Sequence, residues 1–166
     1  MADSDEQAQA SEGTWPGVHL AYDFVGSSYD WILQRLDAAD SRIQTLQTFA
    51  ASITLAAPIL AASVIKDVDF RSPWFILALS AFITVVVVGA VARVSGSVKL
   101  INPQVFYGQW LHYSEWEFKK NAVYWAGQHF DANSSLVNNK AWVAFGMTAL
   151  LLVEVGLLLA WVLTQV

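Results

Sequence analysis

Three long apolar segments constrain the fold of this chain more than any other feature of its sequence. They occupy residues 45–65, 74–91 and 141–163. A helix needs about 20 apolar residues to cross a bilayer core of about 30 Å, and all three segments come close to that length. Because 55% of the 166 residues are hydrophobic and only 14% are charged, the composition excludes an ordinary soluble domain. The sequence predicts an all-α membrane protein with three transmembrane helices in contact with membrane lipid.

The polar segment KDVDFRSP, residues 66–73, separates the first two apolar segments. It is suited to a turn, and Pro73 is suited to the first turn of the helix that follows. We therefore expect a transmembrane hairpin over residues 45–91 and a third transmembrane helix over residues 141–166. Indole rings favour the membrane interface, and three tryptophans lie near the span ends: Trp74, Trp142 and Trp161.

The distribution of basic residues predicts the orientation, because Lys and Arg accumulate in the cytoplasmic flanks of membrane spans. If the N-terminus is cytoplasmic, that side carries seven basic residues, which are Arg35, Arg42, Arg93, Lys99, Lys119, Lys120 and Lys140. The other side carries two, Lys66 and Arg71. The sequence favours a cytoplasmic N-terminus and a C-terminus on the opposite side.

A long cytoplasmic helix is expected over residues 21–44, continuous with the first span. Neither Gly nor Pro occurs from Ser28 to Ala57, and Ser27 or Ser28 is a candidate N-cap. Apolar residues recur in alternating four- and three-residue steps, and these residues are Ile32, Leu36, Ala39, Ile43 and Leu46. Residues 1–20 are expected to form a disordered acidic tail.

The connection over residues 92–140 is too long for a turn and is also expected to be cytoplasmic. It holds nine aromatic residues between Phe106 and Phe130. Pro103 suits the start of a helix there, and the sequence DANSS around residue 133 suits its end or a sharp turn. We expect an aromatic-rich helix that lies between the helix over 21–44 and either the membrane surface or a neighbouring subunit. Four residues are predicted to form this packing or partner surface: Trp31, Trp110, Tyr113 and Trp116.

Acidic residues are concentrated before the first span. Eight of the 14 acids lie there, and the formal net charge of the chain is -5. This pattern argues against a polyanionic partner for the N-terminal part, so no nucleic acid is expected to bind.

Glu154 lies near the middle of the third apolar segment, where an ionised carboxylate costs several kcal/mol. One interpretation is a protonated or hydrogen-bonded carboxyl group that locks one helix to another through a hydroxyl such as that of Ser80 or Thr84. The other is a carboxylate that faces a water-filled path in an oligomer, where a ring of such groups selects cations or relays protons.

The first span contains Pro58, which leaves the carbonyl of Thr54 without its usual helical donor. The span is also rich in hydroxyl groups. A packed interior helix explains both features through small-residue contacts, and a pore-lining helix explains them equally well. Glu154, Thr54 and Pro58 are therefore the predicted pore-lining or interhelical residues.

Neither a metal site nor an active site is predicted. The pairs His112 with Glu115 and His129 with Asp131 lack a third or fourth ligand nearby in the sequence, as a protein metal site requires. The chain contains no cysteine, and no nucleophile elbow, Walker loop or dinucleotide glycine motif occurs. We expect no cofactor and no enzymatic activity.

The junction between the predicted cytoplasmic helix and the first span carries a charged helix that leads into a Thr- and Ala-rich segment. Its residues are Tyr29, Gln34-Arg35-Leu36-Asp37, Asp40, Arg42-Ile43 and Thr45-Leu46-Gln47-Thr48-Phe49. This pattern, over residues 25–95, resembles that of the SLATT families, small bacterial membrane proteins with a two-span hairpin that are encoded beside nucleotide-signalling or DNA-sensing genes. The resemblance implies an antiviral effector of the bacterial inner membrane that oligomerises and permeabilises it. The third span is a departure from the two-span form.

Two functions are predicted. The first is a homo-oligomeric effector that forms a pore or permeabilises the bacterial inner membrane on a signal from a cytoplasmic partner or a small nucleotide ligand. It requires assembly, because three spans enclose little of a path. The alternative is a non-conducting membrane anchor or adaptor that recruits a cytoplasmic partner through the same helices.

Overall fold

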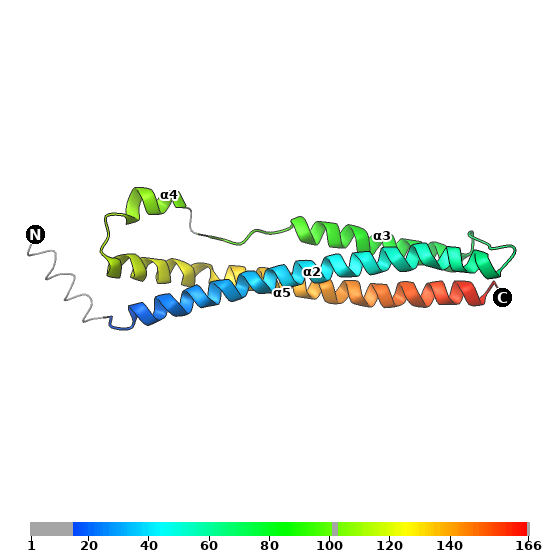
Figure 1. The fold of residues 1–166 in the computed structure, drawn as a ribbon, viewed down its shortest axis with the longest axis horizontal. Coiled ribbons are helices and arrows are strands. Elements are labelled where there is room, and N and C mark those ends of the chain that lie inside the picture. The colour runs from blue at the N-terminus through cyan, green and yellow to red at the C-terminus, as the bar shows by residue number, and fades with distance from the viewer. Residues whose placement is uncertain (1–14, 101–102, 166) are drawn as a thin grey trace, which may run out of the picture. The chain divides into compact units, whose positions relative to one another are not determined.

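The computed structural model describes residues 15–100 and 103–165. In chain order its elements are α2 (Val18–Val64), α3 (Pro73–Val94), α4 (Pro103–Val105), the π-helix η1 (Phe106–Trp110) and α5 (Glu115–Leu163) (Figure 1). Helices α2, α3 and α5 are each long and apolar enough to cross a membrane. The prediction of a helical chain with three candidate membrane spans is confirmed. The expected acidic tail falls mainly on residues 1–14, which lie outside the described residues.

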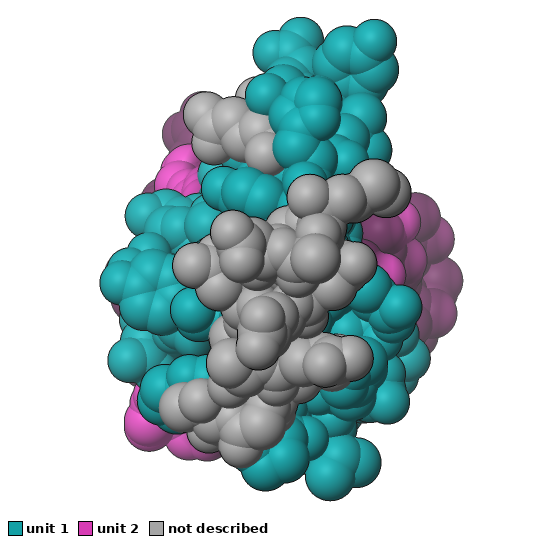
Figure 2. Space-filling view, turned by 90° about the vertical axis from the view of Figure 1, so that its left-hand side faces the viewer, with its two compact units in different colours: residues 1–35, 97–136 teal, residues 36–96, 137–166 magenta. Residues whose placement is uncertain are grey.

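The chain divides into two compact units, which are coloured separately in Figure 2. Unit 1 comprises residues 1–35 and 97–136, and unit 2 comprises residues 36–96 and 137–166. Helices α2 and α5 contribute residues to both units, α3 belongs to unit 2, and α4 and η1 belong to unit 1.

The buried residues of unit 2 recur at spacings of three, four and seven residues, the period of helices that pack at shallow angles. In α5 they are Val137, Lys140, Ala144, Met147, Glu154, Leu158 and Trp161. In α3 they are Ala78, Val85, Gly89 and Ala92. In α2 they are Ala39, Ile43, Ala50, Thr54 and Ala61. The small residues among them allow the three helix backbones to approach closely.

Within unit 2, α2 and α5 run parallel (Figure 1). Their contacts keep one register, since Asp40 meets Lys140 and Thr54 meets Glu154. Helix α3 runs antiparallel to both, as a hairpin after α2 requires (Figure 1).

Gly89 lies buried in α3, close to side chains of both neighbouring helices. A Cβ atom on Gly89 would lie 2.6 Å from Nε2 of Gln47 in α2 and 2.9 Å from Cε of Met147 in α5. The space is filled because Gln47 Nε2 donates a hydrogen bond of 3.0 Å to the carbonyl of Val86. A side chain on Gly89 would therefore displace this contact.

The predicted helix boundaries are wrong at two places. Helix α2 begins at Val18 rather than at an N-cap on Ser27 or Ser28. The hydroxyls of these two serines donate to carbonyls four residues back within the helix, at 3.1 Å and 2.8 Å. A serine hydroxyl can thus find a hydrogen-bond acceptor inside a helix as well as at its start. Gly26 is also tolerated inside α2.

The second boundary error concerns the aromatic connection and the third span. The connection does not form one helix from Pro103 to about residue 133, because α4 and η1 end at Trp110 and α5 begins at Glu115. Ser114 and Glu117 form a capping box at this start, with reciprocal bonds of 3.2 Å and 3.3 Å between side chain and backbone. Helix α5 then continues through residue 133 without interruption.

Candidate functional site

Glu154 is the most unusual polar group in unit 2. Its side chain is fully buried, and its Oε1 atom accepts a hydrogen bond from the Thr54 hydroxyl across α2 and α5. Thr54 is itself buried. The hydroxyl group that contacts Glu154 thus belongs to Thr54. The hydroxyls of the expected partners, Ser80 and Thr84, instead donate to carbonyls of their own helix at 2.8 Å.

The second carboxyl oxygen, Oε2 of Glu154, has no hydrogen-bond partner among the described residues. Pro58 lies one helical turn beyond Thr54 within α2 and has no N–H to offer the Thr54 carbonyl. One stretch of the bundle therefore combines a hydroxyl, a carbonyl without its helical donor and a half-satisfied carboxyl group.

A second polar contact joins the same helices two heptads earlier in the chain. Lys140 is 5% exposed, and its Nζ donates to both carboxylate oxygens of Asp40, at 2.7 Å and 2.9 Å. The Asp40 side chain retains 33% of its exposure, so water also reaches it. Both charged groups in this contact have a partner of opposite charge. The carboxyl group of Glu154, in contrast, has one oxygen without a partner among the described residues.

The outer face of α2 in unit 2 carries an open groove of about 420 Å³. Four of its six lining residues carry a hydroxyl group; the six are Ser41, Gln44, Thr45, Thr48, Phe49 and Ser52. The hydroxyls of Thr45, Thr48 and Ser52 donate to carbonyls four residues back, at 2.8 Å to 3.0 Å. Three of the four hydroxyl groups on this face therefore have an acceptor within α2.

Trp161, at the end of α5, is fully buried. Its Nε1 donates to the carbonyl of Asp69 at 3.0 Å, and its ring lies 4.8 Å from that of Phe75 and 5.8 Å from that of Phe70. It anchors the connection between α2 and α3 to the end of α5. The other two interface candidates, Trp74 and Trp142, are exposed.

The four aromatic residues predicted for the cytoplasmic surface all lie in unit 1 but in different surroundings. Trp31 is exposed, with the Arg35 guanidinium 4.6 Å from its ring centre. Trp110 packs edge-on against Phe118 at 5.5 Å. Tyr113 is exposed, whereas Trp116 is buried beneath the Lys120 ammonium, 5.2 Å away.

Sequence reasoning missed the polar contact that holds the connection after α3 in unit 1. Asn133 is 1% exposed; its Oδ1 accepts the Lys99 N–H at 2.9 Å and its Nδ2 donates to the Lys99 carbonyl at 3.2 Å. Nδ2 also donates to the Tyr29 hydroxyl at 3.4 Å, and that hydroxyl donates to the Ala126 carbonyl at 3.5 Å. Burial raises the pKa of Tyr29, against the opposing effect of the Asn133 bond, so the hydroxyl keeps its proton.

A second missed contact joins the first turns of α2 and α5 in unit 1. The Lys119 ammonium lies 2.9 Å from His19 Nδ1 and 2.6 Å from Glu115 Oε1. The bond from Lys119 lowers the pKa of the exposed Glu115 carboxyl group. The only sequence signal for this contact was the Glu–Lys spacing of four residues within α5.

Comparison with protein-family models, curated proteins and solved structures finds no match to this chain. Among the described residues, no group of three or more His, Cys, Asp and Glu side chains is placed to hold a metal ion.

Proposed function

We propose that this chain is a homo-oligomeric membrane effector that conducts ions across, or permeabilises, the bacterial inner membrane. The N-terminus and unit 1 lie in the cytoplasm in this proposal, and the C-terminus lies on the opposite side. A cytoplasmic partner or a small nucleotide ligand supplies the signal that raises conduction above a basal level. The resemblance to the SLATT families suggests antiviral defence as the setting.

The single observation that carries the proposal is the half-satisfied carboxyl group of Glu154. It is completely buried, and its Oε2 has no partner among the described residues. A buried polar atom without a partner costs about 1–3 kcal/mol, and leucine at this position would avoid that cost. Such a group is explained if Oε2 gains water or an ion in a second, conducting arrangement of the helices.

Pro58 and Thr54 supply a means for this rearrangement. The missing hydrogen bond at Pro58 weakens α2 next to the Thr54 hydroxyl that holds Glu154. In our proposal α2 bends there, the Thr54 contact breaks, and Glu154 turns toward a path between subunits. The hydroxyl-lined face of α2, from Ser41 to Ser52, is suited to contact with another subunit or with water in that path.

The experiment is a measurement of inner-membrane potential in bacteria that express the chain. We expect depolarisation by the wild type and at least a tenfold smaller response from Glu154→Gln at matched protein level. Glu115→Gln is the matched control, because Glu115 is exposed in unit 1 and forms its ion pair with Lys119 on its own helix. Equal depolarisation by wild type and Glu154→Gln would remove Glu154 from the path.

The alternative function, a non-conducting adaptor, is favoured by one different observation. Unit 1 exposes several large apolar side chains, which include Leu20, Phe24, Trp31, Tyr107 and Leu111. Exposed apolar surface of this kind is typical of protein interaction sites. An adaptor is expected to leave the membrane potential unchanged and to lose one specific partner on Trp31→Ala while retaining it on Trp142→Ala.

A further inference from the structure

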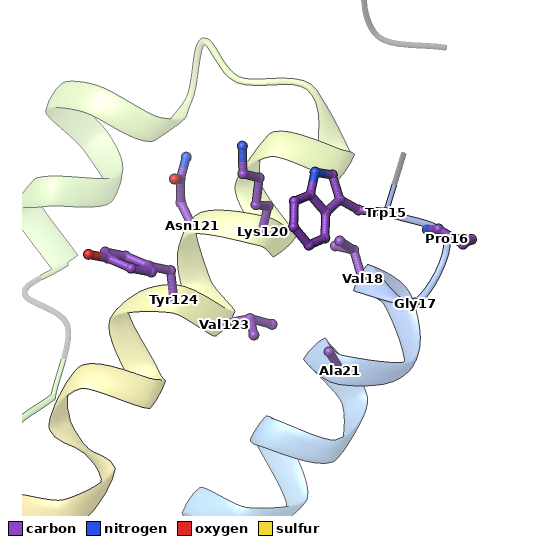
Figure 3. A pocket seen from close by; sticks show the side chains of 9 residues that line it. All are labelled: Trp15, Pro16, Gly17, Val18, Ala21, Lys120, Asn121, Val123 and Tyr124. Atoms are coloured by element: carbon purple, nitrogen blue, oxygen red, sulfur yellow. The ribbon is translucent and has the colours of Figure 1, made fainter. Parts of the chain in front are cut away.

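A pocket of about 610 Å³ lies in unit 1 between the first turns of α2 and α5 (Figure 3). Its volume is that of a typical small-molecule site. Trp15 and Val18 line it on the α2 side, and Val123 and Tyr124 line it on the α5 side. Val123 points toward α2 (Figure 3), so the floor of the pocket is apolar.

One wall of the pocket offers an aromatic ring for stacking. Trp15 is 59% exposed, and its ring lies beside Lys120 (Figure 3). The ring of Tyr124, the other aromatic residue of the lining, points away from Trp15 (Figure 3). The Trp15 ring pairs with no other ring among the described residues. An exposed ring that faces a pocket of this size favours a planar aromatic ligand, because stacking contributes about 0.5–1.5 kcal/mol beyond the apolar area it buries.

The rim of the pocket is positively charged although the chain as a whole carries a net charge of -5. Lys120 lies at the rim, forms no ion pair within the described part of the chain, and is held over the ring of the buried Trp116. The first turn of α2 contains no acidic residue that would neutralise the positive end of this helix. Asn121, beside Lys120, adds an amide that can accept and donate.

From the Trp15 ring and the Lys120 charge, we infer that the pocket binds a small planar aromatic anion. The ring of the ligand stacks on Trp15 over the apolar floor, and its anionic group contacts Lys120 at the rim. This chemistry is shared by aromatic carboxylates and by nucleoside monophosphates. The inference does not depend on ion conduction, because it concerns unit 1 alone.

The test is equilibrium binding to the full chain in lipid nanodiscs, with two pairs of probes that differ in charge. Indole-3-carboxylate is compared with indole-3-carboxamide, and adenosine 5′-monophosphate with adenosine. We expect at least one anion to bind saturably with a dissociation constant below about 1 mM, and its neutral counterpart to bind about tenfold more weakly. Binding of the carboxylate alone or of the phosphate alone would identify which source the pocket accepts.

Four variants assign the binding to this pocket. Lys120→Gln should weaken binding of the anion about tenfold, so that it binds no more tightly than the neutral probe. Trp15→Ala should weaken binding of both probes by about three- to tenfold. Lys66→Gln and Tyr107→Ala are matched controls at exposed positions outside the pocket and should bind as wild type. The inference is overturned if neither anion binds saturably, if each neutral probe binds as tightly as its anion, or if Lys120→Gln and Trp15→Ala leave binding unchanged.

Discussion

Helices α2 and α5 meet through two polar contacts in unit 2, and the two contacts differ in how completely they are satisfied. Lys140 uses both oxygens of Asp40, whereas Thr54 satisfies only one oxygen of Glu154. Asp40 remains partly open to water, and Glu154 does not. A compensated pair can fix the register of two helices, while a half-satisfied carboxyl group weakens the packing it belongs to. We therefore expect the first contact to contribute stability, and the proposed function rests on the second.

The largest effect on stability is expected for Lys140→Met. It removes the ammonium group that pairs with Asp40, and the carboxylate of Asp40 is only partly exposed to water. We therefore expect a loss of about 2–3 kcal/mol in the free energy of unfolding. The measurement is unfolding in detergent, with Lys66→Met in the exposed connection as control. A loss no larger than that of the control would contradict the structural role of the pair.

Thr54→Val is expected to have an intermediate effect. It removes the hydroxyl that satisfies Oε1 of Glu154 and leaves both oxygens of a buried carboxyl group without partners, at a cost of about 1–2 kcal/mol. Thr48→Val, on the exposed face of α2, is the matched control and should change stability by less than about 0.5 kcal/mol. Equal losses in the two variants would show that the Thr54 contact adds nothing to stability.

Glu154→Leu is expected to have the smallest effect, within about 1 kcal/mol of wild type. The variant loses one hydrogen bond but also removes the unpartnered Oε2 from the core, and such replacements are close to neutral. Thr54 can then donate to the carbonyl four residues back, as Thr48 and Ser52 do. When Thr54→Val is added to Glu154→Leu, it should cost about 1 kcal/mol less than in the wild type. Strong destabilisation by Glu154→Leu alone would make Glu154 a structural residue and remove the contrast with Lys140.

Much of the fold could be predicted because apolar length and spacing report directly on membrane-spanning helices. The steps through Ile32, Ala39 and Ile43 indicated a buried face, and all three residues are buried. Pro73 was expected to open a helix, and α3 begins there. Residues whose role is local or periodic were therefore readable from the sequence.

The predictions failed where a residue can serve either of two local structural roles and a contact with a distant segment of the chain decides between them. Asn133 lies in a sequence typical of a helix end, yet its amide binds the Lys99 backbone and α5 continues past it. Glu154 could have met a hydroxyl on α2 or α3, and only the packing of the three helices selects Thr54. The capping box of Ser114 and Glu117 was readable from its spacing and would have placed the start of α5.

The most direct test of this account is ion flux from vesicles reconstituted with equal amounts of folded wild type, Glu154→Leu and Lys140→Met. We expect flux in the wild type and at least a tenfold lower flux in Glu154→Leu, although this variant is nearly as stable as the wild type. Flux per folded molecule in Lys140→Met should be close to that of the wild type. Wild-type flux in Glu154→Leu, or a loss confined to Lys140→Met, would contradict the assignment of function to the half-satisfied carboxyl group.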